Sequence, residues 1–459
     1  MRKLIAKLVN GEISRRDFAT RVLGMGFGMM TVESILETVP VAEGKTSSHP
    51  AKNLETFRAE PFSEKTPYEQ WIEKEGVPVH DGYFVPNVRT AELKPWRRLG
   101  ANGAIINLEG AEATDGAYLC EIAPAAATNP QRYLFEESIY VLDGEGETTV
   151  WHENRPRQTF KWKKGTLFSP PLNTWRIHRN SGRAPARFIS VTDLPLVMDL
   201  YHNADFIFNN DFVFRDRYDN QPDYFTVNES KMRIAGSAAT FGEGEKGAVG
   251  VLDTGLIPDL NQIQLFAAKA RGLKNKSAEV ILSDNSMQTH VSEFEIGTYK
   301  RAHRHGPGSH VLSLGGAGYT LMWTSVPRYS EAPKKVRVDW TEGTLFVPPD
   351  RWFHQHFNTG ESSAKYMATT WIGGKYWVKG MGGGGRTHRL NTISFHAGGN
   401  MIEHDRLPGR RPHDSRNVRS GLEEAWRYSA HAGKEGLGTE PLAIASGSER
   451  TVNSKGRFR

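Results

Sequence analysis

The histidines in the second half of the chain are the residues whose spacing points most directly to chemistry. Five of the 16 histidines fall between positions 303 and 356. One residue separates His303 from His305. On a β-strand both side chains would therefore point to the same face, with Cβ atoms roughly 6–7 Å apart. With His354 as a third ligand, three neutral imidazoles would leave a divalent ion its full positive charge. Such an ion would keep open positions for anionic oxygen ligands and O2.

The segments around these histidines recur earlier in the chain, which indicates two copies of one structural unit. Each copy contains short apolar runs, a Gly-x-Gly turn and a pair of prolines. This pattern predicts short strands in an antiparallel sandwich or barrel, because paired prolines stop a central strand. The matching segments, at offsets of 172 or 178 residues, are 142–146 with 314–318, 165–171 with 343–349, and 175–180 with 353–358.

The two copies resemble the cupin superfamily, whose motifs are G-x5-H-x-H-x3-4-E-x6-G and G-x5-P-x-G-x2-H-x3-N. The resemblance implies an all-β chain of two tandem barrels of the double-stranded β-helix, or jelly-roll, type, with short helical segments at the termini and in the linker. Copy two matches the motifs at Gly297, His303, His305, Gly316, Gly343, Pro349, His354 and Asn358, and copy one matches at Glu137, Gly144, Gly165, Pro171 and Asn180.

The order of the segments gives an expected domain organisation. The bridge at 193–212, DLPLVMDLYHNADFIFNNDF, is similar to the connection in gentisate 1,2-dioxygenase-like bicupins. We expect a leader at 1–45, an N-terminal arm at 46–95, a first barrel at 96–200, a linker at 201–265, a second barrel at 266–380, and a Gly-rich connector with a basic tail at 381–459.

The first copy lacks the ligands that the resemblance requires. Gln131 and Tyr133 stand at the two histidine positions of its first motif, and Arg176 stands at the histidine position of its second. The remaining Glu137 is one carboxylate and cannot hold a transition metal alone, while Arg176 adds a fixed positive charge. We therefore expect one metal per chain, in the second barrel. The first barrel is then a structural barrel or, alternatively, an anion pocket built around Arg176.

The second copy departs from the cupin pattern at one position. Ser309 stands where the motif has glutamate, and His310 follows it. Neighbouring residues of a strand face opposite ways, so only one of the two should point inward. A shift at the turn 306–308 keeps His310 as an alternative fourth ligand, and His356 shares a face with His354. Candidate substrate contacts are Trp352, Arg301 and Arg351.

The resemblance to gentisate dioxygenase-like bicupins implies a function. It implies Fe(II) on three histidines and ring cleavage of a hydroxylated aromatic acid by O2, with Mn(II), Ni(II), Cu(II) and Zn(II) as rival metals. Those dioxygenases carry iron in the first cupin, whereas here only the second has the ligands. One alternative is a non-redox metal bicupin, a decarboxylase or isomerase, although oxalate decarboxylase-like enzymes use a glutamate where this chain has Ser309. Another alternative is a non-catalytic cupin that binds a small ligand.

Composition excludes several classes of protein. In 459 residues, 38% hydrophobic and 24% charged residues exclude a disordered chain. The single cysteine, Cys120, excludes an intramolecular disulfide and thiolate-rich metal sites, and we expect it to be a small core residue. The net charge of +6 comes mainly from the tail after position 386, where acids are interleaved, so we expect no nucleic-acid partner.

The two termini carry further expectations. Arg15 and Arg16, followed by an apolar stretch at 22–32, resemble a twin-arginine export signal and predict a periplasmic protein; the alternative is an ordinary amphipathic helix of a cytoplasmic protein. No apolar run is long enough to predict a transmembrane helix. The tail, through Leu422 and Trp426, is expected to pack on a neighbouring copy in a homo-oligomer.

Overall fold

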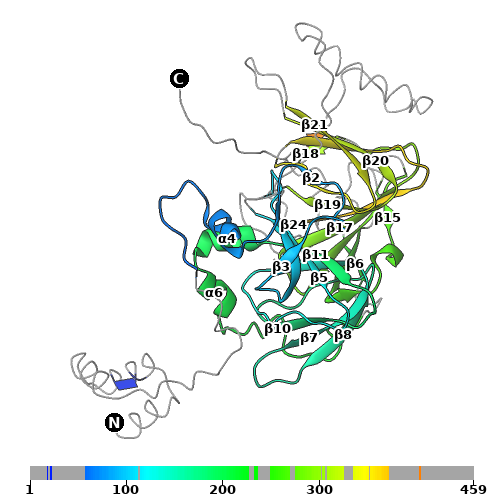
Figure 1. Ribbon diagram of the computed structural model, residues 1–459. Coiled ribbons are helices and arrows are strands. Elements are labelled where there is room, and N and C mark those ends of the chain that lie inside the picture. Colours follow the sequence, from blue (N-terminus) through cyan, green and yellow to red (C-terminus); the bar gives the residue numbers. More distant parts are fainter. Residues whose placement is uncertain are drawn as a thin grey trace, which may run out of the picture.

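The computed structural model shows an all-β chain, as the sequence predicts (Figure 1). The helices whose bounds the structure describes are α4 (Pro67–Glu75), α5 (Leu194–Tyr201), α6 (Ala204–Asn209) and the short 3-10 helix η4 (Leu260–Gln262). None of the helices in the described residues is long and apolar enough to cross a membrane. The structure describes residues 57–111, 114–226, 232–235, 249–268, 274–300, 302–304, 308–324, 334–350, 352–371 and 403–404, together with Phe18, Arg21 and Val22.

The first barrel consists of a large sheet and a small sheet. The large sheet has the order β1-β4-β5-β11-β6-β9-β14, with β3 beside β4, and the small sheet has the order β10-β7-β8. The bounds are β1 (Val79–His80), β3 (Lys94–Trp96), β4 (Ala101–Ile106), β5 (Gly116–Ile122), β6 (Glu137–Asp143), β7 (Glu145–Trp151), β8 (Gln158–Lys163), β9 (Leu167–Phe168), β10 (Trp175–Asn180), β11 (Ala186–Thr192) and β14 (Leu256–Ile257).

The second barrel has the same plan. Its large sheet has the order β12-β13-β16-β17-β24-β19-β22-β2, with β15 beside β16, and its small sheet has the order β21-β20-β23-β18-β25. The bounds are β2 (Phe84–Val85), β12 (Met232–Ala235), β13 (Val249–Thr254), β15 (Phe266–Ala267), β16 (Lys276–Leu282), β17 (Met287–Phe294), β18 (His303–Arg304), β19 (His310–Gly315), β20 (Ala317–Trp323), β21 (Lys335–Thr341), β22 (Leu345–Phe346), β23 (Phe353–Asn358), β24 (Ala364–Trp371) and β25 (Glu403–His404).

The strand register reproduces the sequence repeat residue by residue. In the first barrel Arg176 of β10 lies opposite Val150 of β7, and in the second His354 of β23 lies opposite Met322 of β20, at the same offsets. Even the irregularity between β6 and β11 returns at the matching place between β19 and β24. The register therefore gives a position-by-position alignment of the two barrels.

Each barrel receives one edge strand from the other half of the chain. β2 lies in sequence between β1 and β3 of the first barrel but pairs with β22 of the second barrel, and β14 lies between β13 and β15 of the second barrel but pairs with β9 of the first. The two exchanges are equivalent, because Val85 lies opposite Leu345 just as Ile257 lies opposite Leu167. Each exchanged strand covers a sheet edge that would otherwise expose unpaired backbone groups.

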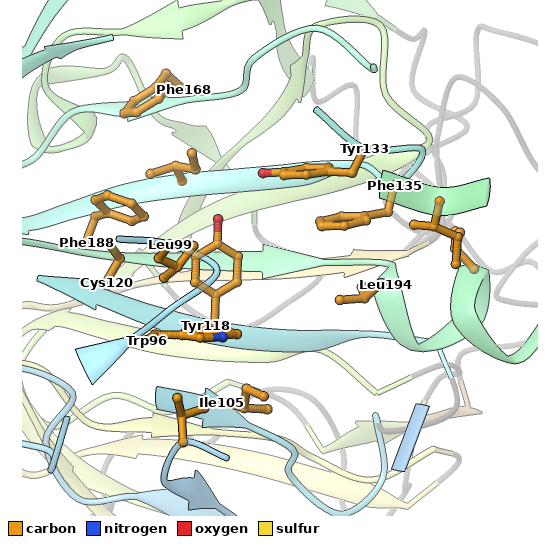
Figure 2. Packing of buried hydrophobic residues seen from close by; sticks show 14 of the residues in the cluster. Trp96, Leu99, Ile105, Tyr118, Cys120, Tyr133, Phe135, Phe168, Phe188 and Leu194 are labelled. Carbon is orange, nitrogen blue, oxygen red and sulfur yellow. The ribbon is translucent and has the colours of Figure 1, made fainter. Parts of the chain in front are cut away.

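Three apolar clusters form the core. The first fills the first barrel, and Figure 2 shows its aromatic side chains together with Cys120, which is fully buried as predicted. The second cluster lies between the two large sheets, and the third fills the second barrel. Strand alternation sorts the residues: on β11, Phe188 belongs to the first cluster and Ile189 to the second. The large sheets therefore meet back to back, with the small sheets at opposite ends (Figure 1).

Candidate functional site

His303 and His354 come together inside the second barrel. They lie directly opposite each other on β18 and β23, with ring centroids 4.3 Å apart, and His354 is only 3% exposed. With a metal–nitrogen distance of about 2.1 Å, two imidazoles on one ion would have their ring centres roughly 4.5–5 Å apart. The observed 4.3 Å is slightly shorter than this range, so the two rings are close enough to reach one ion.

The third predicted ligand, His305, lies outside the described residues, as do Arg301 and Arg351. Among the described residues there is no group of three histidine, cysteine or carboxylate side chains that could hold an ion. The described part of the site is therefore the pair of imidazoles, and His305 stays a prediction. The backbone of β25 brings one more histidine next to this pair. His404 lies opposite His303 in the strand register, and no motif in the sequence had singled it out.

Ser309 and His310 face different parts of the molecule. Ser309 is buried at the position that Glu137 occupies in the first barrel. On β19, His310 shares its face with Leu312, which belongs to the cluster between the barrels, whereas Val311 faces the interior of the second barrel. Neither ring nitrogen of His310 has a hydrogen-bond partner among the described residues, and burial lowers the pKa of His310 to about 3. The structure thus does not bring His310 to the His303–His354 pair.

His356 is held by a network that both barrels share. Its Nδ1 lies 2.8 Å from the Oγ1 of Thr320, and the indole of Trp340 donates to the same oxygen at 3.1 Å. In the first barrel, His178, Thr148 and Trp162 form the same contacts at 2.7 and 2.9 Å. The first barrel has the same network although it lacks the metal-ligand residues. The network therefore orients the histidine side chain in both barrels and is not itself a sign of a metal site. The ring of His356 lies 5.6 Å from that of His354.

Trp352, a candidate substrate contact, is half-buried at the start of β23. Its ring centroid lies 5.9 Å from that of Tyr83, and the Nζ of Lys334 lies 5.6 Å from the Trp352 ring centre. Tyr83 immediately precedes β2, the exchanged strand. The segment between β1 and β3 therefore packs beside Trp352 of the second barrel.

In the first barrel the ligand positions are occupied by side chains that contact one another. Glu137, 1% exposed, accepts hydrogen bonds from Tyr133 at 2.5 Å, Tyr118 at 3.0 Å and Ser190 at 2.8 Å. Figure 2 shows the hydroxyls of both tyrosines pointing toward each other. The Arg176 guanidinium lies 3.9 Å from Glu137 and 3.8 Å from the centre of the Tyr133 ring. Burial raises the pKa of both phenols, so each keeps its proton for donation.

The interior of the second barrel is polar at positions where the first is mostly apolar, which sequence reasoning missed. The register supplies the correspondence: Ser292 lies opposite Tyr366 as Cys120 lies opposite Phe188. Extending the sequence repeat upstream at nearly the same offset would have exposed these differences. From the first barrel to the second, the replacements are Ile105 to Glu279, Tyr118 to His290, Cys120 to Ser292, Thr128 to Lys300 and Phe188 to Tyr366.

No protein-family model and no curated protein matches the sequence. Similar solved structures include vicilin from Corylus avellana (hazelnut), with 11% identity and a TM-score of 0.41, covering 62% of this chain and 85% of that chain. A single-residue variant of oxalate decarboxylase from Bacillus subtilis shares 12% identity, with a TM-score of 0.41 and coverage of 63% and 77%. The formate complex of oxalate decarboxylase from Lactobacillus farciminis shares 13% identity, with a TM-score of 0.41 and coverage of 63% and 86%.

These similarities are distant, so the class of protein follows from strand order and register. Two matched, mostly antiparallel barrels, stacked through their large sheets, make the chain a protein of two tandem jelly-roll barrels, the fold that the sequence predicts. Within that fold, the second barrel carries the paired imidazoles and the polar interior.

Proposed function

We propose that the second barrel binds one divalent metal ion through His303, His305 and His354, and that the protein is a metal-dependent oxygenase. The observation that carries this proposal is the direct pairing of His303 with His354, whose ring centroids, 4.3 Å apart, are close enough for both rings to reach one ion. When bound, an Fe(II) ion would supply oxygen activation beside an anionic substrate. Mn, Ni, Cu and Zn are the rival metals.

The charge of the proposed site favours small carboxylates as substrates. The three ligands are neutral, and Ser309 stands where a ligating glutamate would cancel part of the ion's charge. An ion with its full charge prefers anionic oxygen ligands, such as the carboxylate and hydroxyl of a hydroxylated aromatic acid. We propose Trp352 as a contact for an aromatic ring, and Arg301 and Arg351 as partners for the carboxylate.

The first barrel is proposed to hold no metal. Its ligand positions contain a buried carboxylate that is already satisfied by three hydroxyl donors, and an arginine beside it. Replacing two imidazoles by Gln131 and Arg176 removes ligands and adds a positive charge, both of which oppose cation binding. The expected stoichiometry is therefore one metal per chain.

A non-redox function is the second candidate, and one observation favours it. The ammonium of Lys300 and the phenol of Tyr366 contact each other inside the second barrel, and such groups can move a proton without O2. A decarboxylase or isomerase acting on the same class of carboxylate would use them. The third possibility, a cupin that binds a ligand without turnover, would retain metal and ligand binding alone.

Metal analysis and oxygen uptake test the proposal together. Protein purified from its native host should contain close to one iron per chain, and an oxygen electrode should record uptake with hydroxylated benzoates. His354→Ala should lose most of the metal, because two imidazoles make a poor site. The matched control is His178→Ala, at a histidine held by the same threonine and tryptophan contacts in the first barrel, which should keep its metal. Two metals per chain, or metal loss only in the control, would contradict the assignment.

A further inference from the structure

A buried lysine lies inside the second barrel and contacts two hydroxyl groups. Lys300 is 1% exposed, and its Nζ donates hydrogen bonds to the Oγ of Ser292, at 3.0 Å, and to the hydroxyl of Tyr366. The same Nζ lies 4.6 Å from the centre of the Tyr366 ring. Ser292, Lys300 and Tyr366, here called the lysine cluster, come from β17, the stretch before β18, and β24.

The lysine cluster lies next to the candidate metal ligands. The ring of Tyr366 is 5.2 Å from that of His356, which in turn is 5.6 Å from the ring of His354. The backbone N–H of Lys300 donates to the carbonyl of His356 at 2.9 Å. Tyr366 also belongs to the apolar cluster that fills the second barrel. The lysine cluster and the imidazole pair are thus two polar regions of one interior, with His356 between them.

The fold does not need the lysine cluster. The first barrel has the same register and the same backbone hydrogen bond, from Thr128 to the carbonyl of His178 at 2.8 Å, but its three corresponding residues are Cys120, Thr128 and Phe188. A buried ammonium carries a large desolvation cost, which these neutral side chains avoid. A costly group present in the barrel with the candidate ligands, and absent from its structural copy, points to a role in binding.

We propose that the lysine cluster binds a second anionic group of the substrate, a carboxylate that lies away from the metal-bound end. This inference rests on the proposed function, which places the first anionic end at His303 and His354. An ammonium and a phenol both donate hydrogen bonds to a carboxylate, and such charge-assisted bonds are the strong ones. The contacts described for the cluster supply one amine and two hydroxyl donors, which suit a carboxylate. The substrate class is therefore a small dicarboxylate, or an aromatic acid with a second carboxylate.

Calorimetry on the cobalt(II)-loaded protein tests this assignment with defined probes. The probes are the dicarboxylates glutarate and adipate. Each is compared with the monocarboxylate of equal chain length, which is pentanoate for glutarate and hexanoate for adipate. In wild type, at least one dicarboxylate should bind about tenfold or more tightly than its monocarboxylate, the size expected for charge-assisted bonds. Lys300→Met and Tyr366→Phe should abolish that preference and leave monocarboxylate affinity unchanged.

Two controls keep the result interpretable. Tyr366→Phe installs the residue that the first barrel tolerates at Phe188, so it should fold, as circular dichroism and cobalt content would show. Lys276→Met removes an exposed lysine of β16, 53% exposed, and should keep the dicarboxylate preference. If wild type binds both classes of probe equally, or if the lysine cluster variants keep the preference, the second anion site is refuted while metal-dependent binding stands. If no carboxylate binds the cobalt protein, the proposed function fails as well.

Discussion

The buried pair of Glu137 and Arg176 provides a test of what the first barrel does. Glu137→Ala would leave three hydroxyl donors without their acceptor and the guanidinium without its counter-charge. Breaking a buried ion pair from one side costs about 3–5 kcal/mol. Because the two charges are 3.9 Å apart rather than in direct contact, we expect a loss of unfolding free energy at the lower end, about 3 kcal/mol.

The reverse change should cost less, because the two partners are satisfied unequally. Arg176→Met leaves Glu137 with its three hydroxyl donors, whereas the Nε and Nη1 of Arg176 have no hydrogen-bond partner in the part of the chain that the structure describes. We therefore expect Arg176→Met to cost about 1–2 kcal/mol. The double variant should cost less than the sum of the single variants, by a coupling of about 1–2 kcal/mol.

Urea unfolding followed by tryptophan fluorescence measures these differences, with metal content determined on the same samples. Metal content should not change, because the pair lies in the other barrel. Glu295→Ala is the control: it breaks an ion pair with Lys274 that is shorter, 2.6 Å, but about half exposed, and should cost about 0–1 kcal/mol. If Arg176→Met costs as much as Glu137→Ala, or if the two effects simply add, the pair is not the structural unit inferred here.

Three further predictions concern pH, export and assembly. Burial raises the pKa of Asp115, which accepts a hydrogen bond from the backbone of β24, so the folded state holds a proton that the unfolded state releases. The free energy of unfolding should therefore fall as the pH rises above about 4, the usual Asp pKa. Asp115→Asn should flatten that pH dependence, as measured by urea titrations at several pH values. Replacing Arg15 and Arg16 by lysine should keep the protein in the cytoplasm, and a wild type that fractionates there would contradict the export proposal. Light scattering should give a homo-oligomer for the full chain, and a monomer would refute a role of Leu422 and Trp426 in assembly; both of these proposals concern residues outside the described part of the chain.

The repeat could be predicted from the sequence, together with the residues that occupy equivalent positions in the two barrels. Motif spacing matched Gln131 to His303 and Arg176 to His354, and the structure pairs Gln131 with Arg176 as it pairs His303 with His354. This worked because side chains on a strand alternate and because glycines and prolines mark the turns. His310 also shows the value of alternation, since its neighbour Ser309 takes the inward position that strand parity allowed for only one of them.

The edge strands and the lysine cluster could not be predicted in the same way. β2 and β14 have two residues each, too few for any periodic pattern, and their partners are far away in sequence. In the sequence Lys300 looks like an ordinary exposed lysine, because lysines are mostly exposed. Its burial depends on Ser292 and Tyr366, which reach it from two other segments. Only the three-dimensional structure shows that these three side chains contact one another.

The exchange of β2 and β14 has a consequence for how the chain can be divided. Neither half carries all of its own edge: a first half ending before the linker would lack β14, and a second half starting after the first barrel would lack β2. A protein made of one such repeat would have an arm that fits the edge of another copy and not its own. Two copies would then swap arms to form a dimer. The present chain has the architecture of such a dimer with its two subunits fused into one chain. Each half, produced alone, should therefore be more soluble when the missing edge strand of the other half is added as a peptide.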